Sequence, residues 1–215
     1  MARKRKNEPG IFITFEGVEG SGKSIQSQLL YESLVSDGYE VFLTREPGGT
    51  KPGREIREIL LQGSREINSY TEFFLYLADR SQNISEIIRP KLQKGQIVIS
   101  DRHFDSTIAY QMAGRGIPKK GIETIKNLEV FRDIEPDLTF LLDADPAVVQ
   151  KRVRYPDRIE RESIDFHRCV RDAYLKLAKD NPLRITLIDA EDTIDNIHQK
   201  IKVKVLALIE EVNYE

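Results

Sequence analysis

The stretch Gly17-Val18-Glu19-Gly20-Ser21-Gly22-Lys23-Ser24 constrains the fold of this chain more than any other. It matches the G-x-x-x-x-G-K-[ST] pattern of a phosphate-binding loop, or P-loop, in which backbone N–H groups converge on one anion. The apolar residues 11–15 before it predict a buried strand, and residues 25–35 after it predict a helix. Strand, loop and helix in this order are the context that a P-loop needs. The sequence therefore predicts a nucleoside triphosphate site.

Each fixed position of the P-loop has a physical role. Gly17 and Gly22 let the backbone turn without a Cβ clash. Lys23 brings a positive charge to the β- and γ-phosphates, and the Ser24 hydroxyl is a hard oxygen ligand suited to Mg²⁺. We therefore expect residues 17–24 to hold the triphosphate and Ser24 to contact the metal.

The rest of the chain alternates between predicted strands and predicted helices. Further strands are expected at residues 39–44, 97–101, 138–143 and 184–189. Helices are expected at residues 54–61, 70–93, 106–112, 121–131, 147–153 and 163–179. A final helix is expected after a cap at Asp192 or Thr193, with one apolar face formed by Ile194, Ile197, Ile201, Val205 and Leu208. This order predicts an α/β fold of the P-loop NTPase type, with a five-stranded parallel sheet flanked by helices and ligands at the carboxyl ends of its strands.

Composition narrows the class of protein. The chain has 215 residues and a formal net charge of −2, whereas proteins that bind the nucleic-acid backbone usually carry a clear basic excess. We therefore expect no nucleic-acid partner, and no apolar run is long enough to predict a membrane span. The lone Cys169 is typical of a reducing cytoplasm. Residues 1–10 are expected to form a flexible basic tail, and residues 11–215 a single domain with a lid around 151–161.

Asp101 and two groups of arginines complete the predicted phosphate chemistry. Asp101 ends the apolar strand 97–101, where a carboxylate can hold Mg²⁺ directly or through water. Arginine matches phosphate oxygens with two parallel donors and keeps its charge in a closed site. One group surrounds the expected acceptor side: Arg45, Arg57 and Arg102. The other surrounds Pro156: Arg152, Arg154, Arg158 and Arg161. A solvated helix face is the favoured interpretation for Arg161, and a mobile lid for Arg154 and Arg158.

Other notable side chains have simpler interpretations. Tyr76 and Arg80 lie four residues apart and so share a helix face. That spacing suits a ring stacked on a base beside a guanidinium that binds its edge, although periodicity alone favours a core Tyr. Three neighbours are expected in the core: Phe73, Phe74 and Leu77. The three histidines have no metal-ligand spacing and indicate surface or ordinary structural roles: His103, His167 and His198. Cys169 is expected to be a packed thiol rather than a nucleophile.

Several segments together resemble the thymidylate kinase family. They are Phe15-Glu16-Gly17, Thr44-Arg45-Glu46-Pro47-Gly48-Gly49-Thr50, Asp101-Arg102 with Ser106, Thr107 and Ala109-Tyr110-Gln111, Arg115-Gly116-Ile117, Pro136-Asp137-Leu138-Thr139, Leu142-Asp143, and Asp157-Arg158-Ile159-Glu160. They follow the family order over most of the chain. The resemblance implies a nucleoside monophosphate kinase-like fold, a homodimer packed through helices, and ATP- and Mg²⁺-dependent conversion of dTMP to dTDP.

The resemblance also implies roles for individual residues. Tyr76 takes the place of the ring that stacks on thymine, with Arg80, Thr107 and Gln111 at the base edge. Arg45, Arg57 and Arg102 resemble ligands of the acceptor phosphate. Tyr110 resembles the residue set against the 2′-position, and Glu16 a carboxylate near the acceptor sugar and the metal. The lid is similar to the bacterial type, in which Arg154 or Arg158 would reach the transferred phosphoryl group.

Three departures from the family pattern accompany this resemblance. Tyr76 stands where Phe is usual, His103 stands where Tyr often follows Asp-Arg, and the lid is short. Two alternative functions stay open at this stage. A different small-molecule kinase would keep the chemistry and change the acceptor. A nucleotide-dependent switch is disfavoured, because the chain has no Asn-Lys-x-Asp motif for reading guanine and a switch has no use for two arginine groups.

Overall fold

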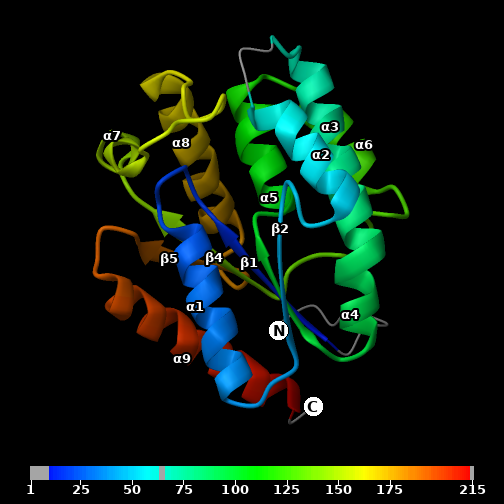
Figure 1. Ribbon diagram of the computed structural model, residues 1–215, viewed down its shortest axis with the longest axis vertical. Helices are drawn as coiled ribbons and strands as arrows, with labels where there is room; N and C mark the ends of the chain where they lie inside the picture. The colour runs from blue at the N-terminus through cyan, green and yellow to red at the C-terminus, as the bar shows by residue number, and fades with distance from the viewer. Residues whose placement is uncertain (1–9, 63–65, 214–215) are drawn as a thin grey trace.

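The computed structural model of the protein describes residues 10–62 and 66–213, and a five-stranded parallel sheet lies at its centre (Figure 1). The strand order is β2-β3-β1-β4-β5. The strands are β1 (Ile11–Glu16), β2 (Val41–Arg45), β3 (Ile97–Asp101), β4 (Leu138–Asp143) and β5 (Ile185–Asp189). All five predicted strands are confirmed, and with them the predicted fold class.

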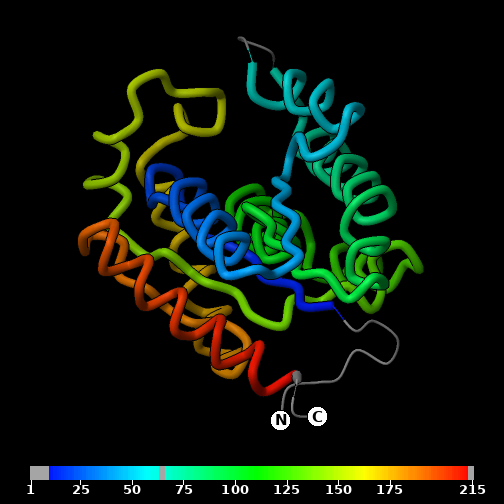
Figure 2. The backbone as a smooth tube through the Cα atoms, turned by 60° about the horizontal axis from the view of Figure 1, so that its bottom comes forward, coloured from blue at the N-terminus to red at the C-terminus, as the bar shows by residue number. Residues whose placement is uncertain are grey.

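Helices connect successive strands and cover both faces of the sheet. They are α1 (Lys23–Ser36), α2 (Lys51–Leu61), α3 (Ser69–Asn83), α4 (Arg89–Gln93), α5 (Phe104–Ser106), α6 (Lys119–Lys126), α7 (Pro146–Val149), α8 (Ile164–Asp180) and α9 (Ile194–Asn213). Two π-helical segments, η1 (Ile84–Ile88) and η2 (Thr107–Gly114), continue α3 and α5, and a 3₁₀ turn, η3 (Gln150–Arg152), follows α7. α1 and α9 lie side by side, and Figure 2 shows α2 and α3 on the opposite side of the molecule from the chain between η3 and α8.

The central strand β1 is buried along its whole length because both faces of the sheet are covered. Successive side chains of a strand point to opposite faces. Ile11, Ile13 and Phe15 accordingly join one core cluster, which includes residues of α1, α8 and α9, whereas Phe12 joins a second cluster with residues of α3 and α4. A continuous apolar strand, rather than an alternating one, is the pattern of a parallel sheet between two helical layers.

The register of the sheet brings three functional loops to one edge. Phe15 of β1 pairs with Asp101 of β3, and Asp101 pairs with Arg45 of β2. The P-loop, the loop after Arg45 and the loop after Asp101 therefore leave the sheet at the same level. Carboxyl ends of adjacent parallel strands are where such folds bind ligands, so the sheet itself places the site.

The end of α6 and the buried face of α9 differ from the prediction. α6 ends at Lys126, and the predicted continuation to residue 131 is a series of turns. These turns place Phe131 against Phe104, with ring centroids 6.1 Å apart, so core packing decides the path of the chain. In α9 the buried face is formed by Ile197, Ile201, Val205 and Ile209, whereas Ile194 is half exposed and Leu208 is partly buried. Thr193 is the cap, since its hydroxyl accepts a hydrogen bond from the Asn196 amide.

Two side chains predicted to be packed are exposed. Phe74 is 57% exposed because Phe73 and Leu77 already fill the inward face of α3. Cys169 is exposed on α8, where its thiol donates to the Ala113 carbonyl oxygen. No helix in the described part of the chain is long and apolar enough to cross a membrane. The predicted basic tail falls outside the described residues, apart from Gly10, whose amide donates to the Leu92 carbonyl oxygen.

Candidate active site

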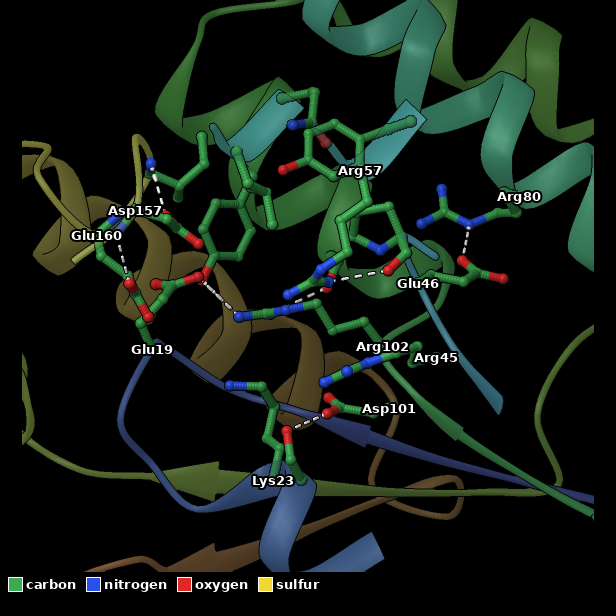
Figure 3. Close-up of a pocket in the computed structure, with 18 of the residues that line it drawn as sticks. Glu19, Lys23, Arg45, Glu46, Arg57, Arg80, Asp101, Arg102, Asp157 and Glu160 are labelled. Carbon is green, nitrogen blue, oxygen red and sulfur yellow. Dashed lines mark hydrogen bonds and ion pairs between the residues drawn. The ribbon is translucent and has the colours of Figure 1, made fainter. Parts of the chain in front are cut away.

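A cavity opens at the carboxyl ends of β1, β2 and β3 (Figure 3). Its lining comes from the P-loop, the loop after β2, α2, α3, η2 and residues 157–160. Twelve of the predicted site residues line it: Glu19, Gly20, Lys23, Ser24, Arg45, Arg57, Tyr76, Arg80, Asp101, Arg102, Tyr110 and Gln111. The structure thus brings the predicted donor side and the predicted acceptor side into one cavity.

The P-loop has the strained, close-packed backbone that its glycines predict. Gly17, Gly20 and Gly22 all have positive φ angles, of 139°, 76° and 93°. A Cβ on Gly17 would lie 2.4 Å from the Leu142 carbonyl oxygen, so a larger residue does not fit there. The Lys23 ammonium lies inside the loop and donates to the Val18 carbonyl oxygen at 2.8 Å. This side chain is therefore fixed at the start of α1, where the helix dipole also favours an anion.

Ser24 and Asp101 form the oxygen-rich corner of the cavity. The Ser24 hydroxyl donates to the Asp101 carboxylate, and both residues line the cavity beside Lys23. A hydroxyl and a carboxylate suit Mg²⁺, which takes one or two protein ligands and fills its remaining positions with phosphate oxygens and water. No group of three acidic, histidine or cysteine side chains suited to a metal occurs in the described ranges. The donor set of Ser24 and Asp101 fits a metal that arrives with a nucleotide.

Arg45 and Arg57 give the opposite wall of the cavity an excess of positive charge. Burial, followed by the neighbouring Arg45, lowers the pKa of the Arg57 guanidinium. Within the described part of the chain, no carboxylate forms an ion pair with either side chain, and Arg57 donates to the Pro47 carbonyl oxygen at 2.9 Å. Figure 3 shows Arg45, Arg57 and Arg102 converging on the centre of the cavity. Two adjacent unpaired guanidiniums are a favourable site for a phosphate dianion.

Arg80 is the largest fully buried side chain in the described chain, and every side of its guanidinium is occupied. It donates to the Glu46 carboxylate at 2.6 Å, to the Thr107 hydroxyl at 2.5 Å and to the His103 carbonyl oxygen at 2.9 Å. Burial alone would raise the pKa of the Glu46 carboxyl, but Arg80 and His103 lower it to about 2. Thr107 does not line the cavity. The pair Arg80–Glu46 therefore forms a fixed, ionised part of the cavity lining.

Arg102 and Glu19 join the P-loop to the acceptor side. Arg102 donates to the Glu19 carboxylate at 2.7 Å and to the Tyr110 hydroxyl at 3.2 Å, and Tyr110 donates to Glu19 at 2.6 Å. Burial would raise the pKa of Glu19, but Arg102, His167 and Lys23 lower it to about 2. Glu19 is thus an ionised carboxylate between the two halves of the cavity. The buried His167 has the structural role expected for a histidine, since it packs against Glu19 at 3.4 Å.

Comparisons with known proteins agree with this geometry. The family model described as thymidylate kinase matches residues 15–201. The chain belongs to the thymidylate kinase family. It is 46% identical to the thymidylate kinase of Halothermothrix orenii, over 91% of this chain and 96% of that protein. It is 44% identical to the thymidylate kinase of Pelobacter propionicus, over 92% of this chain and 94% of that one. A crystal structure of thymidylate kinase from Ehrlichia chaffeensis superposes with a TM-score of 0.77 at 38% identity, covering 92% of this chain and 98% of the other.

Besides Thr107, three residues that the thymidylate kinase resemblance places in the site lie outside the cavity lining. Glu16 is buried beneath it and accepts hydrogen bonds from the His103 amide, the Ser106 hydroxyl and the Tyr174 hydroxyl. Arg154 is exposed. Arg158 donates to the Glu72 carboxylate at 2.6 Å instead of pointing to the P-loop. Their expected roles toward sugar, metal and phosphoryl group stay predictions.

Four acidic cavity or near-cavity residues were not singled out as ligands by sequence reasoning. Glu46, Asp157 and Glu160 line the cavity, and Glu160 accepts a hydrogen bond from the Asp157 amide at 2.7 Å. Asp79 lies beneath the loop after β2, where burial and then Glu46 raise its pKa to about 7. The sequence did give a signal for three of them, because Glu46, Asp157 and Glu160 lie within segments that resemble the family. Asp79 gave none, because a charged residue within an amphipathic helix is ordinarily exposed.

Proposed function

We propose that the protein transfers the γ-phosphoryl group of ATP to dTMP, giving dTDP and ADP. One observation carries the proposal: a P-loop ammonium and an unpaired pair of arginines face each other across one cavity in a chain of the thymidylate kinase family. The first supplies a triphosphate site and the second a monophosphate site. In-line transfer needs a triphosphate site and a monophosphate site within one cavity.

The donor side is formed by the P-loop. Its amides and Lys23 hold the β- and γ-phosphates, and α1 adds its positive end. Mg²⁺ would be held by Ser24 and Asp101 and would neutralise charge on the phosphate oxygens. Lys23 then stabilises the negative charge that develops on the transferred group.

The acceptor side is formed by Arg45, Arg57 and Arg102, which orient the dTMP phosphate. The ring of Tyr76 stacks on the base, with Gln111 at the base edge and Tyr110 beside the sugar. Arg80 and Thr107 act from beneath this pocket by fixing its floor. A phosphate monoester with a second pKa of about 6 is largely a dianion at pH 7, so its oxygen attacks without a general base. Catalysis therefore rests on position and charge.

The segment 151–161 is proposed as the lid of a single domain. Arg154 is free to move in from the surface, whereas Arg158 would have to leave Glu72 to reach the phosphates. We therefore favour Arg154 as the lid arginine that contacts the transferred group. We also propose a cytoplasmic location, as expected from the single cysteine in the sequence.

The proposal is tested by measuring ADP release with Mg-ATP against dTMP, dUMP, dGMP, AMP, CMP and UMP. We expect turnover to depend on dTMP and to be weak with UMP and AMP, because the proposal gives Tyr76 and Gln111 the base and sets Tyr110 against a 2′-hydroxyl. Preferential turnover with another monophosphate would keep the phosphoryl chemistry and reject the Tyr76–Gln111 assignment. Nucleotide hydrolysis without stimulation by any acceptor would instead indicate a switch.

The pH dependence tests the assignment of Lys23 separately. Burial, and then Arg102, lowers the pKa of the Lys23 ammonium to about 8 in the free protein. Lys23 is charged below that pH and neutral above it, so kcat/KM for ATP should fall as the pH rises through about 8, since this ratio reports the free enzyme. Bound phosphates stabilise the charged ammonium of Lys23 and so raise its pKa. The alkaline fall in kcat, which reports the enzyme with substrate bound, should therefore occur at a higher pH than the fall in kcat/KM. The guanidinium of the variant Lys23→Arg stays charged over this pH range. If the residual activity of this variant still falls near pH 8, the fall belongs to a group other than Lys23.

We propose a homodimer that packs through α2 and α3. Tyr70 and Phe74 are 50% and 57% exposed on one face of α3 with ring centroids 6.4 Å apart, and Ile59 of α2 is 38% exposed. Exposed aromatic patches of this kind commonly mark interfaces. Sedimentation at micromolar concentration should give twice the chain mass of 24.8 kDa, and Phe74→Glu should give the single-chain mass. Leu183→Glu, which changes an exposed side chain next to β5, is the matched control. A single-chain mass for the unmodified protein would reject the dimer.

A further inference from the structure

One buried carboxylate, Glu72, holds together parts of the chain that are far apart in sequence. Glu72 lies in the first turn of α3 with its side chain only 1% exposed. Its Oε1 accepts from Arg115 Nε at 3.1 Å and from Gln111 at 3.3 Å. Its Oε2 accepts from the second Arg115 nitrogen at 3.1 Å and from Arg158 at 2.6 Å. We call Glu72, Gln111, Arg115 and Arg158 the Glu72 cluster.

Arg158 is the member of the Glu72 cluster that belongs to the lid. Its amide donates to the Leu61 carbonyl oxygen at 3.3 Å, and its Nε donates to the Leu60 carbonyl oxygen at 2.8 Å. The residues on either side of it, Asp157 and Ile159, line the cavity. The hydrogen bonds of Arg158 to the end of α2 and to Glu72 therefore fix the position of this cavity wall.

The negative charge of Glu72 explains how one carboxylate can hold two arginines together. Burial would raise the pKa of Glu72, but hydrogen bonds and ion pairs with Arg115 and Arg158 lower it, so the group is ionised near neutral pH. Arg115 also pairs with Glu162 at 2.7 Å, whereas Arg158 pairs with Glu72. Without the charge on Glu72, Arg115 and Arg158 would repel each other and the lid would lose its link to α3.

We propose that Glu72 is a positioning residue that holds lid residues 157–160 closed through Arg158 while it orients Gln111 on the acceptor side. This inference rests on the proposed function and adds a physical link between the acceptor pocket and the lid. A closed lid keeps water from the transferred phosphoryl group and keeps donor and acceptor aligned. Loss of the link should slow transfer to dTMP and raise ATP hydrolysis relative to transfer.

The test compares Glu72→Gln with Glu162→Gln, a half-buried neighbour that contacts Arg115 but not Arg158. We expect Glu72→Gln to lower kcat for dTMP by about 10- to 100-fold, the effect of a small misplacement of reacting groups. The ratio of hydrolysis to transfer should rise by a similar factor, while KM for ATP changes little. Glu162→Gln should keep both values near those of the unmodified protein. Equal behaviour of the two variants would overturn the inference, although dTMP-dependent activity of the unmodified protein would leave the proposed function intact.

A double-mutant cycle that combines Glu72→Gln with Arg158→Gln tests whether Glu72 acts on the lid through Arg158. If Glu72 acts through Arg158, the double variant should be no slower than the worse single variant. Additive losses would contradict that route. If Arg158 is instead a direct ligand of the phosphoryl group held back by Glu72, Glu72→Gln frees it, and an unchanged or higher kcat would overturn the inference. If Glu72→Gln does not fold, hydrogen exchange of Arg158→Gln decides: faster exchange of amides 157–162 supports the inference, and unchanged exchange rejects it.

Discussion

Replacing Lys23 with alanine should lower kcat by about 10³-fold or more and leave the fold intact. Lys23 is the one basic residue among P-loop residues 17–24, and the hydrogen bond from its ammonium to the Val18 carbonyl oxygen holds it in place. No neighbouring side chain can take its place, because Arg102 is held by Glu19 and Arg45 belongs to the opposite wall. Steady-state transfer to dTMP measures the loss.

The fold of Lys23→Ala should survive because burying this ammonium is unfavourable, as its lowered pKa records. The thermal midpoint should therefore be unchanged or slightly higher. Lys179→Ala, at the exposed end of α8, is the matched control and should keep full activity. Nearly full turnover of Lys23→Ala would mean that the loop does not hold the donor phosphates, and the proposed function would fall with it.

Replacing Arg80 with methionine should destabilise the protein by about 3–5 kcal/mol, the usual cost of removing one partner of a buried ion pair. Glu46 would remain 1% exposed without its guanidinium partner, and the Thr107 hydroxyl and the His103 carbonyl oxygen would lose their donors. For a chain of this length such a loss lowers Tm by about 6–20 °C. Thermal unfolding followed by circular dichroism measures it.

Two further variants separate the ion pair from simple loss of packing. Adding Glu46→Gln to Arg80→Met removes the stranded charge and should recover part of the stability. Arg168→Met removes an exposed pair with Asp165 and should leave Tm almost unchanged. If Arg80→Met and Arg168→Met unfold at the same temperature, the buried pair does not stabilise the fold as described.

The backbone of the protein was largely predictable because its signals are local and strong. Apolar runs fixed all five strands, and the P-loop fixed the first strand, loop and helix. The exceptions arise where distant contacts override local pattern, as where Phe131 turns the chain toward Phe104 beyond α6. Phe74 is a second exception, because periodicity cannot tell which of two adjacent aromatic residues faces the core.

The part of the cavity formed by loops at the ends of strands was predictable. Pattern placed Lys23, Ser24 and Asp101 and indicated the acceptor arginines, and resemblance favoured the stacking role of Tyr76 over a place in the core. Neither revealed that Arg158 is held by Glu72, because the two residues are 86 positions apart and each reads as an ordinary helix or loop charge. Buried carboxylates such as Asp79 and Glu72 escape sequence reasoning for that reason. Their partners are decided only when the helices pack.

The central position of β1 has a consequence for the order in which the protein is made. The Thr14 hydroxyl on β1 pairs with the Thr139 hydroxyl on β4, which is synthesised 125 residues later. At about 5–20 residues per second, that interval is on the order of 10 s. During it the fully buried strand β1 has no partner on one side, and the P-loop that follows it lacks β4, whose Leu142 carbonyl oxygen packs against Gly17. The nucleotide site is thus a late product of folding, although its motif is among the first segments to leave the ribosome.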